Sequence, residues 1–121
     1  MDKVLHSSNS NEHYTPIQII NDVIEFYHGV IDLDPCSNSL VQPNVNAEFH
    51  YTAELDGLRL PWAGKVFVNP PYGRELPKWI NKAVCEYESQ RVREVLLLVP
   101  SRTFVIKTEV KDETSSACRQ P

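Results

Sequence analysis

The sequence lacks the residue patterns that mark several common classes of protein. Only 3 of its 121 residues are cysteines, and because none form a C-x-x-C pair, neither a disulfide framework nor a zinc site is expected. The 4 histidines also fall outside metal-ligand spacings, so no metal is predicted. No apolar run approaches the roughly 18 residues that cross a membrane, and the N-terminal residues lack the regions of a signal peptide. We therefore expect a soluble protein of a reducing cytoplasm.

Basic residues are nearly absent from the first half of the chain. Residues 1–58 contain Lys3 as their only base against nine acids, whereas residues 59–107 contain nine bases against four acids. The overall charge of −4 argues against a polyanionic partner, but a basic region can attract one locally. Because a solvated helix surface explains the same charges equally well, the charge pattern alone leaves both interpretations open.

Residues 15–29, TPIQIINDVIEFYHG, carry the signals of an amphipathic helix. Thr15 is expected to be the N-cap, Pro16 the first helical residue and Gln18 the partner in a capping box, with Gly29 at the end. Its apolar residues recur at helical spacing, at Ile20, Val23, Ile24 and Tyr27. This face should pack on another element.

Strand-like and helical segments alternate through the rest of the chain. Segments of strand character occur at residues 30–34, 48–52, 64–69 and 94–100. A second helix is expected within residues 74–90, with an apolar face formed by Leu76, Ile80, Ala83, Val84 and Tyr87. This order predicts an α/β fold in which a mostly parallel sheet is flanked by helices.

The length of the chain suits one domain. We expect this domain at residues 13–104, after a flexible arm at 1–12 and before an irregular polar tail at 105–121. Ligands of such sheets bind outside the carboxyl ends of the strands. Two loops follow predicted strands there, at residues 34–36 and 69–72, and both should open on one edge of the sheet.

The second of these loops, Asn69-Pro70-Pro71-Tyr72, has the composition of a binding site for a planar amine. Two prolines in series stiffen the turn and leave their carbonyls free of a strand ladder. The Asn69 side chain and the Pro70 carbonyl offer two acceptors to one amino group, and Tyr72 offers a flat stacking face. The plain alternative is a rigid connection between a strand and a helix.

At these residues the sequence resembles amino-methyltransferases that use S-adenosylmethionine. HYTP, DLDPCSN, LDGL followed by a tryptophan, and VFVNPPYG occur in the order seen in the phage-type DNA N6-adenine methyltransferase family, over residues 12–103. The resemblance implies a Rossmann-like class I methyltransferase fold, S-adenosylmethionine as cofactor and DNA as partner, in the cytoplasm of a bacterial host. The turn alone also fits methyltransferases of protein glutamine or RNA.

The resemblance also implies roles for individual residues. The target-base and catalytic site would comprise Asn69, Pro70, Pro71 and Tyr72. The cofactor site would comprise Thr15, Pro16, Asp34, Pro35, Cys36 and Asp56. Contacts to DNA phosphates would come from Arg74, Lys78, Arg91 and Arg102. The segment DPCSNS departs from the wider methyltransferase pattern because it has no glycine, so Ser37 and Asn38 must take the place of the usual glycines. No acid stands out for binding the ribose hydroxyls, and Glu48 and Glu54 are weak candidates.

The C-terminal residues do not continue the pattern. After residue 103 the sequence turns polar and loses its periodicity, which is typical of a truncated or frame-shifted end, so the fold is expected to be incomplete there. Three alternatives therefore stay open: a DNA adenine methyltransferase of phage or prophage origin, a non-catalytic remnant that binds cofactor or DNA, and a methyltransferase of glutamine or RNA. The oligomeric state and the DNA recognition sequence are not readable from the sequence.

Overall fold

The computed structural model describes residues 14–99 and the backbone of residues 102–106. Its elements, in chain order, are α2 (Ile17–Phe26), β1 (Leu33–Asp34), β2 (Phe49–His50), β3 (Gly64–Val68), the short 3-10 helix η1 (Gly73–Glu75), α3 (Leu76–Glu88), β4 (Val92–Val99) and β5 (Arg102–Ile106). The arm predicted at 1–12, and residues 107–121 of the predicted tail, lie outside the described residues.

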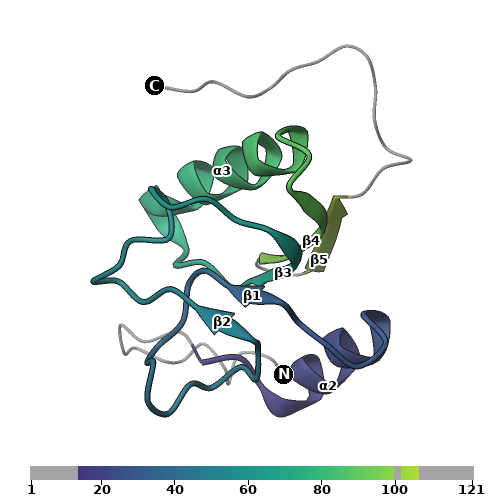
Figure 1. Ribbon diagram of the computed structural model, residues 1–121. Helices are drawn as coiled ribbons and strands as arrows, with labels where there is room; N and C mark the ends of the chain where they lie inside the picture. The colour runs from purple at the N-terminus through teal and green to yellow at the C-terminus, as the bar shows by residue number, and fades with distance from the viewer. Residues whose placement is uncertain (1–13, 100–101, 107–121) are drawn as a thin grey trace.

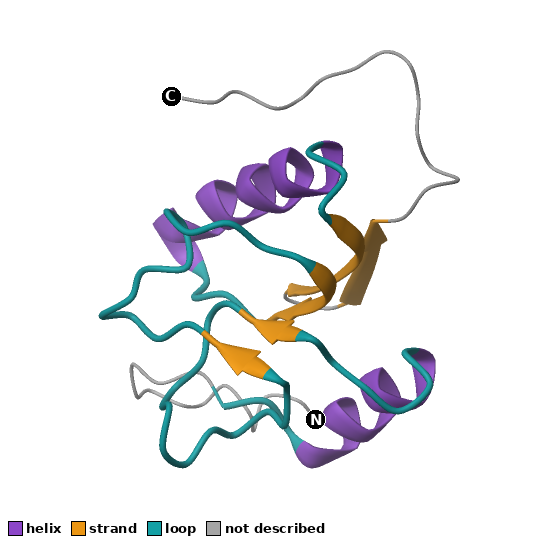
Figure 2. Ribbon diagram, viewed as in Figure 1, coloured by secondary structure: helices purple, strands orange, loops and turns teal. Residues whose placement is uncertain are grey.

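The strands form a single sheet in the order β2-β1-β3-β4-β5. The first four strands in this order are parallel, and β5 runs antiparallel to β4 (Figures 1 and 2). The predicted α/β fold with a mostly parallel sheet is confirmed. Strand β5 was not among the expected elements, and it includes residues 105 and 106 of the predicted tail.

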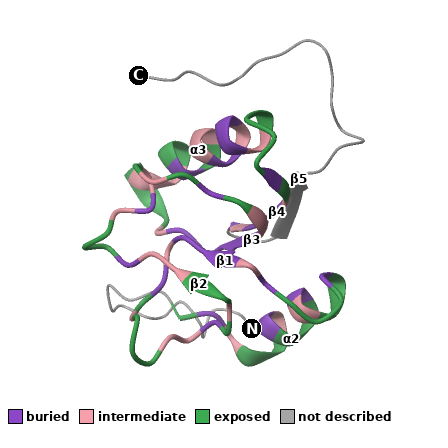
Figure 3. Ribbon diagram, viewed as in Figure 1, coloured by how far each residue is buried: buried purple, intermediate pink, exposed green. Residues whose placement is uncertain are grey.

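Each face of the sheet is covered by one helix, as Figure 1 shows. Because successive residues of a strand point to opposite faces, Val66 and Val68 of β3 join the core on the side of α3, where Trp62 and Trp79 stack with ring centroids 6.3 Å apart. Phe67, between them, joins the core on the side of α2. Both sides of the central strands are therefore buried (Figure 3).

Helix α2 packs through the predicted face but begins later than expected. Ile20, Val23 and Tyr27 are buried against the sheet, and the Tyr27 hydroxyl donates to the Val66 carbonyl at 2.8 Å. The helix starts at Ile17 with Pro16 as N-cap, and no side chain caps it. The predicted Thr15 cap is therefore wrong, because the Thr15 hydroxyl is engaged elsewhere.

Helix α3 packs through only part of its predicted face: Ala83 is buried, and Leu76 and Tyr87 are partly buried against the same core. Trp79 is also buried, whereas Ile80 is exposed.

Glu86 of α3 is buried as well. Its carboxylate accepts hydrogen bonds from the Trp62 backbone N–H at 2.9 Å, from Lys82 at 2.8 Å and from Arg91 at 2.6 Å. Burial alone would raise the pKa of Glu86, but these donors outweigh it and hold the pKa below its ordinary value.

Two expectations from composition can be compared with the described residues. No helix in the described part of the chain is long and apolar enough to span a membrane. Cys36 is a free thiol, as expected of a cysteine outside a disulfide framework.

Candidate active site

The two predicted loops leave the same edge of the sheet. Asp34 ends β1 and Asn69 follows β3, and these two strands are parallel neighbours, with Leu33 paired to Val66. Figure 1 shows the ends of both strands side by side. The arrangement is that of ligand-binding loops at the carboxyl ends of parallel strands.

Asn69 is held in a defined orientation by a polar contact. Its side chain is 7% exposed, and its Nδ2 donates to the Thr15 hydroxyl oxygen at 3.0 Å. Within residues 14–99, no group donates to its Oδ1 or to the backbone carbonyl of Pro70. Both acceptors that the sequence predicted for an amino group are therefore present and unused by these residues.

Tyr72 stands at the rim of this turn. Its ring is 41% exposed, whereas the Pro70 side chain is buried and Pro71 is half-buried. Partial burial raises the pKa of the Tyr72 hydroxyl, so the ring stays neutral. A rigid turn that presents an exposed neutral ring suits stacking on a planar base.

Asp34 is a buried carboxylate with little compensation. It is 2% exposed, and among the described residues only the Cys36 backbone N–H donates to its side chain, at 3.1 Å. Burial raises the pKa of Asp34 to about 7, although this one hydrogen bond lowers it. A carboxylate in this state would be stabilised by a cation, such as the ammonium group of an amino-acid ligand.

The loop after β1 is shaped by side chains rather than by glycines. The Ser37 hydroxyl donates to the Ser39 carbonyl at 3.1 Å, and the Asn38 Oδ1 accepts from the Asn44 N–H at 2.7 Å. These side-chain hydrogen bonds give DPCSNS a defined loop without glycine.

Burial and the nearby Asp34 carboxylate raise the pKa of Cys36 in this loop to about 12. Its thiol is therefore neither a nucleophile nor a metal ligand at neutral pH.

Asp56 is brought beside this loop by a glycine that the sequence analysis missed. A β-carbon on Gly57 would stand 2.0 Å from the Pro35 carbonyl oxygen, so only glycine allows the two segments to approach. Asp56 itself has a φ of +69°, and its Oδ1 accepts from the Leu58 N–H at 3.2 Å. In the sequence, the Asp-Gly turn is the signal that could have identified Gly57. In the structure, its carbonyl accepts a hydrogen bond from the ring N–H of the buried Trp62 at 2.8 Å.

Thr15 and Pro16, which come just before α2, also lie at the site. Pro16 caps α2 with its backbone, whereas Thr15 is 4% exposed and contacts Asn69 through its hydroxyl. The side chain of Asn44, in the loop after β1, also bonds to the Thr15 backbone N–H and carbonyl. Asn44 is a second residue of the site that the sequence analysis did not single out.

The four predicted phosphate contacts do not lie together. Arg74 and Lys78 are exposed just after Tyr72, where Lys78 also lies 3.5 Å from Glu75. The backbone of Arg102 is paired with Val99, which places it at the carboxyl edge. Arg91 precedes β4 and so lies at the opposite, amino edge, where it binds Glu86. The structure therefore does not bring Arg91 to the site.

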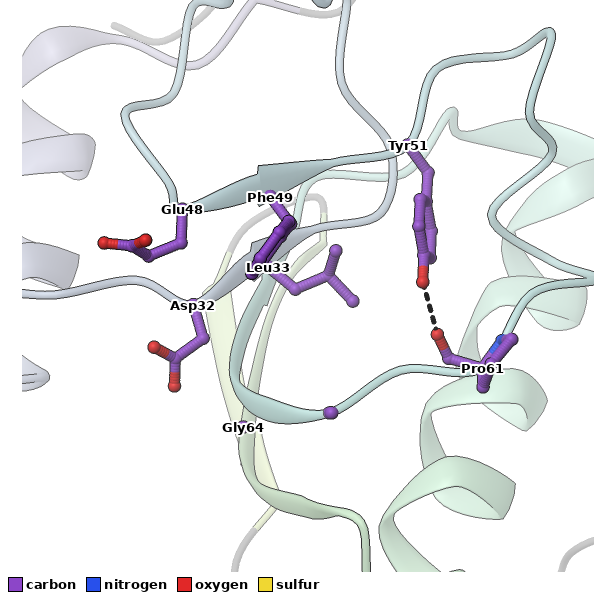
Figure 4. A pocket seen from close by; sticks show the side chains of 8 residues that line it. Asp32, Leu33, Glu48, Phe49, Tyr51, Pro61 and Gly64 are labelled. Atoms are coloured by element: carbon purple, nitrogen blue, oxygen red, sulfur yellow. Dashed lines mark hydrogen bonds between the residues drawn. The ribbon is translucent and has the colours of Figure 1, made fainter.

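An open pocket of about 390 Å³ lies away from these residues. Asp32, Glu48, Phe49, Tyr51 and Pro61 line it, and the Tyr51 hydroxyl donates to the Pro61 carbonyl at 2.7 Å (Figure 4). It includes neither Asp34 nor Asn69. Within the described part of the chain, no three histidine, cysteine or acidic side chains are grouped to hold a metal ion.

The sequence model of one protein family matches most of the chain. This family is described as DNA N-6-adenine-methyltransferase (Dam), and the match covers residues 4–114. It includes both loops of the site and extends past the predicted resemblance over 12–103 at each end. No curated protein and no solved structure matches the chain significantly.

Proposed function

The chain belongs to the DNA N-6-adenine-methyltransferase (Dam) family, and on this premise we propose that it transfers a methyl group from S-adenosylmethionine to the N6 amino group of adenine in DNA. The observation that carries the proposal is the orientation of Asn69, whose Nδ2 is bound to Thr15 while its Oδ1 has no donor among the described residues. We place this activity in the cytoplasm of a bacterial host of a phage or prophage, as the sequence resemblance implies.

The residues of the loop after β1 fit the amino-acid end of the cofactor. Asp34 is buried and accepts a single hydrogen bond from the described residues, so an ammonium group would supply a positive charge to balance its carboxylate. Pro35 and Cys36 shape this loop, and Asp56 lies next to it through the contact of Gly57 with Pro35. The cofactor would supply an electrophilic methyl group on a sulfonium.

The chemistry at the turn needs no strong base. The lone pair of an aromatic amine is delocalised into its ring, and two acceptors on its N–H bonds favour a tetrahedral nitrogen whose lone pair can attack. Asn69 Oδ1 and the Pro70 carbonyl are those acceptors, and Tyr72 would stack on the base after it leaves the helix. With the cofactor bound, the amine would take the methyl group as the sulfur–carbon bond breaks, and would then release a proton to water without a base from the chain.

Basic residues near the turn support a nucleic-acid substrate. Arg74 and Lys78 follow Tyr72, and Arg102 lies at the same edge by its register in the sheet. Such side chains would bind phosphates and supply affinity without sequence information. Arg91, which is paired with Glu86 at the amino edge, is left out of this surface.

The proposal is tested by the transfer of labelled methyl groups to DNA, with RNA and protein substrates in parallel. Asn69→Ala should lower the rate by about 10²–10³-fold, the usual effect of removing one preorganised polar group, while cofactor binding is retained. Asn21→Ala, at an exposed position on α2, is the matched control. Transfer to RNA or protein alone would reject DNA as the substrate. Cofactor binding without any transfer would indicate a binding module.

A further inference from the structure

Thr15 connects the two loops of the site through hydrogen bonds. Its hydroxyl oxygen accepts from Asn69 Nδ2 at 3.0 Å. Its backbone N–H donates to Asn44 Oδ1, and its carbonyl accepts from Asn44 Nδ2 at 3.3 Å. Because both polar atoms of the Asn44 side chain bind the backbone of one residue, they fix the position of Thr15.

Asn44 is in turn anchored to the cofactor loop. Its backbone N–H donates to Asn38 Oδ1 at 2.7 Å, and Asn38 Nδ2 donates to the Gln42 carbonyl at 3.3 Å. A continuous series of hydrogen bonds therefore runs from Asn38 through Asn44 and Thr15 to Asn69. It joins the segment after Asp34 to the predicted acceptor of the target amine.

The orientation of the Asn69 amide decides whether it can serve this role. A rotation of 180° about its last bond would exchange the acceptor Oδ1 for the donor Nδ2, and a donor facing an amino group would be repelled. Because Thr15 is 4% exposed and Asn69 7% exposed, water competes little for their contact. In the structure the hydroxyl accepts from Nδ2, so this contact holds the amide with Oδ1 turned away from Thr15.

We propose that Thr15 is a positioning residue, which directs Asn69 Oδ1 toward the target amine, and that Asn44 holds Thr15 in place. This inference rests on the proposed function and assigns the Thr15 hydroxyl to Asn69, not to the helix cap or to the cofactor. It follows that the loss of this hydroxyl lowers the rate of methyl transfer while leaving cofactor affinity intact.

The test compares two substitutions that differ in one acceptor. Thr15→Val keeps the shape but removes the hydroxyl, and Thr15→Ser keeps the hydroxyl. Thr15→Val should lower kcat by about tenfold, as expected for the loss of one hydrogen bond that orients a catalytic group, and Thr15→Ser should retain most of the wild-type kcat. Thr52→Val, at another buried threonine with no side-chain hydrogen bond to the described residues, is the control for a change of polarity alone.

A second readout does not depend on activity. In protein labelled with ¹⁵N-asparagine, the side-chain amide signal that disappears in Asn69→Ala belongs to Asn69. Its hydrogens should exchange slowly with solvent in the wild type and in Thr15→Ser, and faster in Thr15→Val. Asn44→Ala should also speed this exchange, whereas Asn46→Ala, at an exposed position in the same loop, should not.

The outcomes separate this inference from the proposed function. If the wild type transfers no methyl group but Thr15→Val still frees the Asn69 amide, the proposed function fails, and only the contact between Thr15 and Asn69 stands. An unchanged amide and an unchanged kcat in Thr15→Val would overturn the positioning role. A fall in cofactor affinity that accounts for the whole loss of rate would overturn it too, because Thr15 would then be a cofactor contact.

Discussion

Gly57 and Pro35 lie so close that a β-carbon on residue 57 would stand 2.0 Å from the Pro35 carbonyl oxygen. The contact joins the turn that carries Asp56 to the loop after Asp34. Because Gly57 is buried, a larger side chain at this position could not point into solvent. The two segments would therefore have to move apart.

Gly57→Ala should therefore impair cofactor binding as well as stability. The added methyl group is expected to cost about 1–3 kcal/mol in the free energy of unfolding, the usual range for overpacking, and to weaken the binding of S-adenosylmethionine measured by calorimetry. Gly29→Ala is the control, because an added β-carbon there meets no atom within 4 Å but the φ of +109° is strained. It should lower stability alone, and cofactor affinity unchanged in Gly57→Ala would contradict this interpretation.

Asp34 should make the stability of the ligand-free protein fall as pH rises. Its pKa is about 7 in the folded state, against an ordinary value of 3.8. Between these values the folded state binds more protons than the unfolded state, so stability is greatest at the acidic end and is lost at a slope approaching about 1.4 kcal/mol per pH unit. Urea unfolding of wild type and Asp34→Asn from pH 5 to 8 measures the difference, and equal slopes would contradict the raised pKa.

The same carboxyl predicts a pH dependence of cofactor binding. If the ammonium group of the cofactor binds ionised Asp34, binding releases a proton below the free pKa of about 7. Affinity should therefore rise with pH up to about 7 and then level off. Calorimetric titrations from pH 5.5 to 8 would follow it, and an Asp34→Asn variant should bind weakly with little of this dependence. An affinity that is flat with pH in the wild type would reject the contact.

Glu86 should support the fold rather than the chemistry. Glu86→Ala removes the partner of Lys82, Arg91 and the Trp62 N–H, and breaking a buried charge network typically costs about 3–5 kcal/mol. Because the folded pKa of Glu86 is lowered, its contribution is present above the unfolded pKa and is lost as pH falls through the folded value. Glu88→Ala, at an exposed position, is the control in thermal unfolding; equal melting temperatures for the two variants would refute the prediction.

The sequence predicted the fold and the turn better than it predicted individual side-chain partners. Apolar periodicity located both helices and the four parallel strands, because burial of apolar surface dominates their placement. It could not decide that Thr15 binds Asn69, since a threonine before a helix suits a cap equally well and the competing partner is 54 residues away. Charge along the chain likewise does not reveal that Arg91 lies at the amino edge of the sheet, away from Arg74 and Lys78.

Tyr72 offers a test of base capture that is separate from methyl transfer. Its ring is exposed at the rim of the turn, so Tyr72→Ala should lose about 1–3 kcal/mol of stacking on a flipped base, whereas Tyr72→Phe keeps the flat ring and should retain most of it. DNA with 2-aminopurine at the target position reports flipping by a rise in fluorescence. The rise should be small with Tyr72→Ala and near normal with Tyr72→Phe. If Tyr72→Ala gives the wild-type rise, the ring does not hold the base; if Tyr72→Phe is as defective as Tyr72→Ala, the hydroxyl rather than stacking carries the contact.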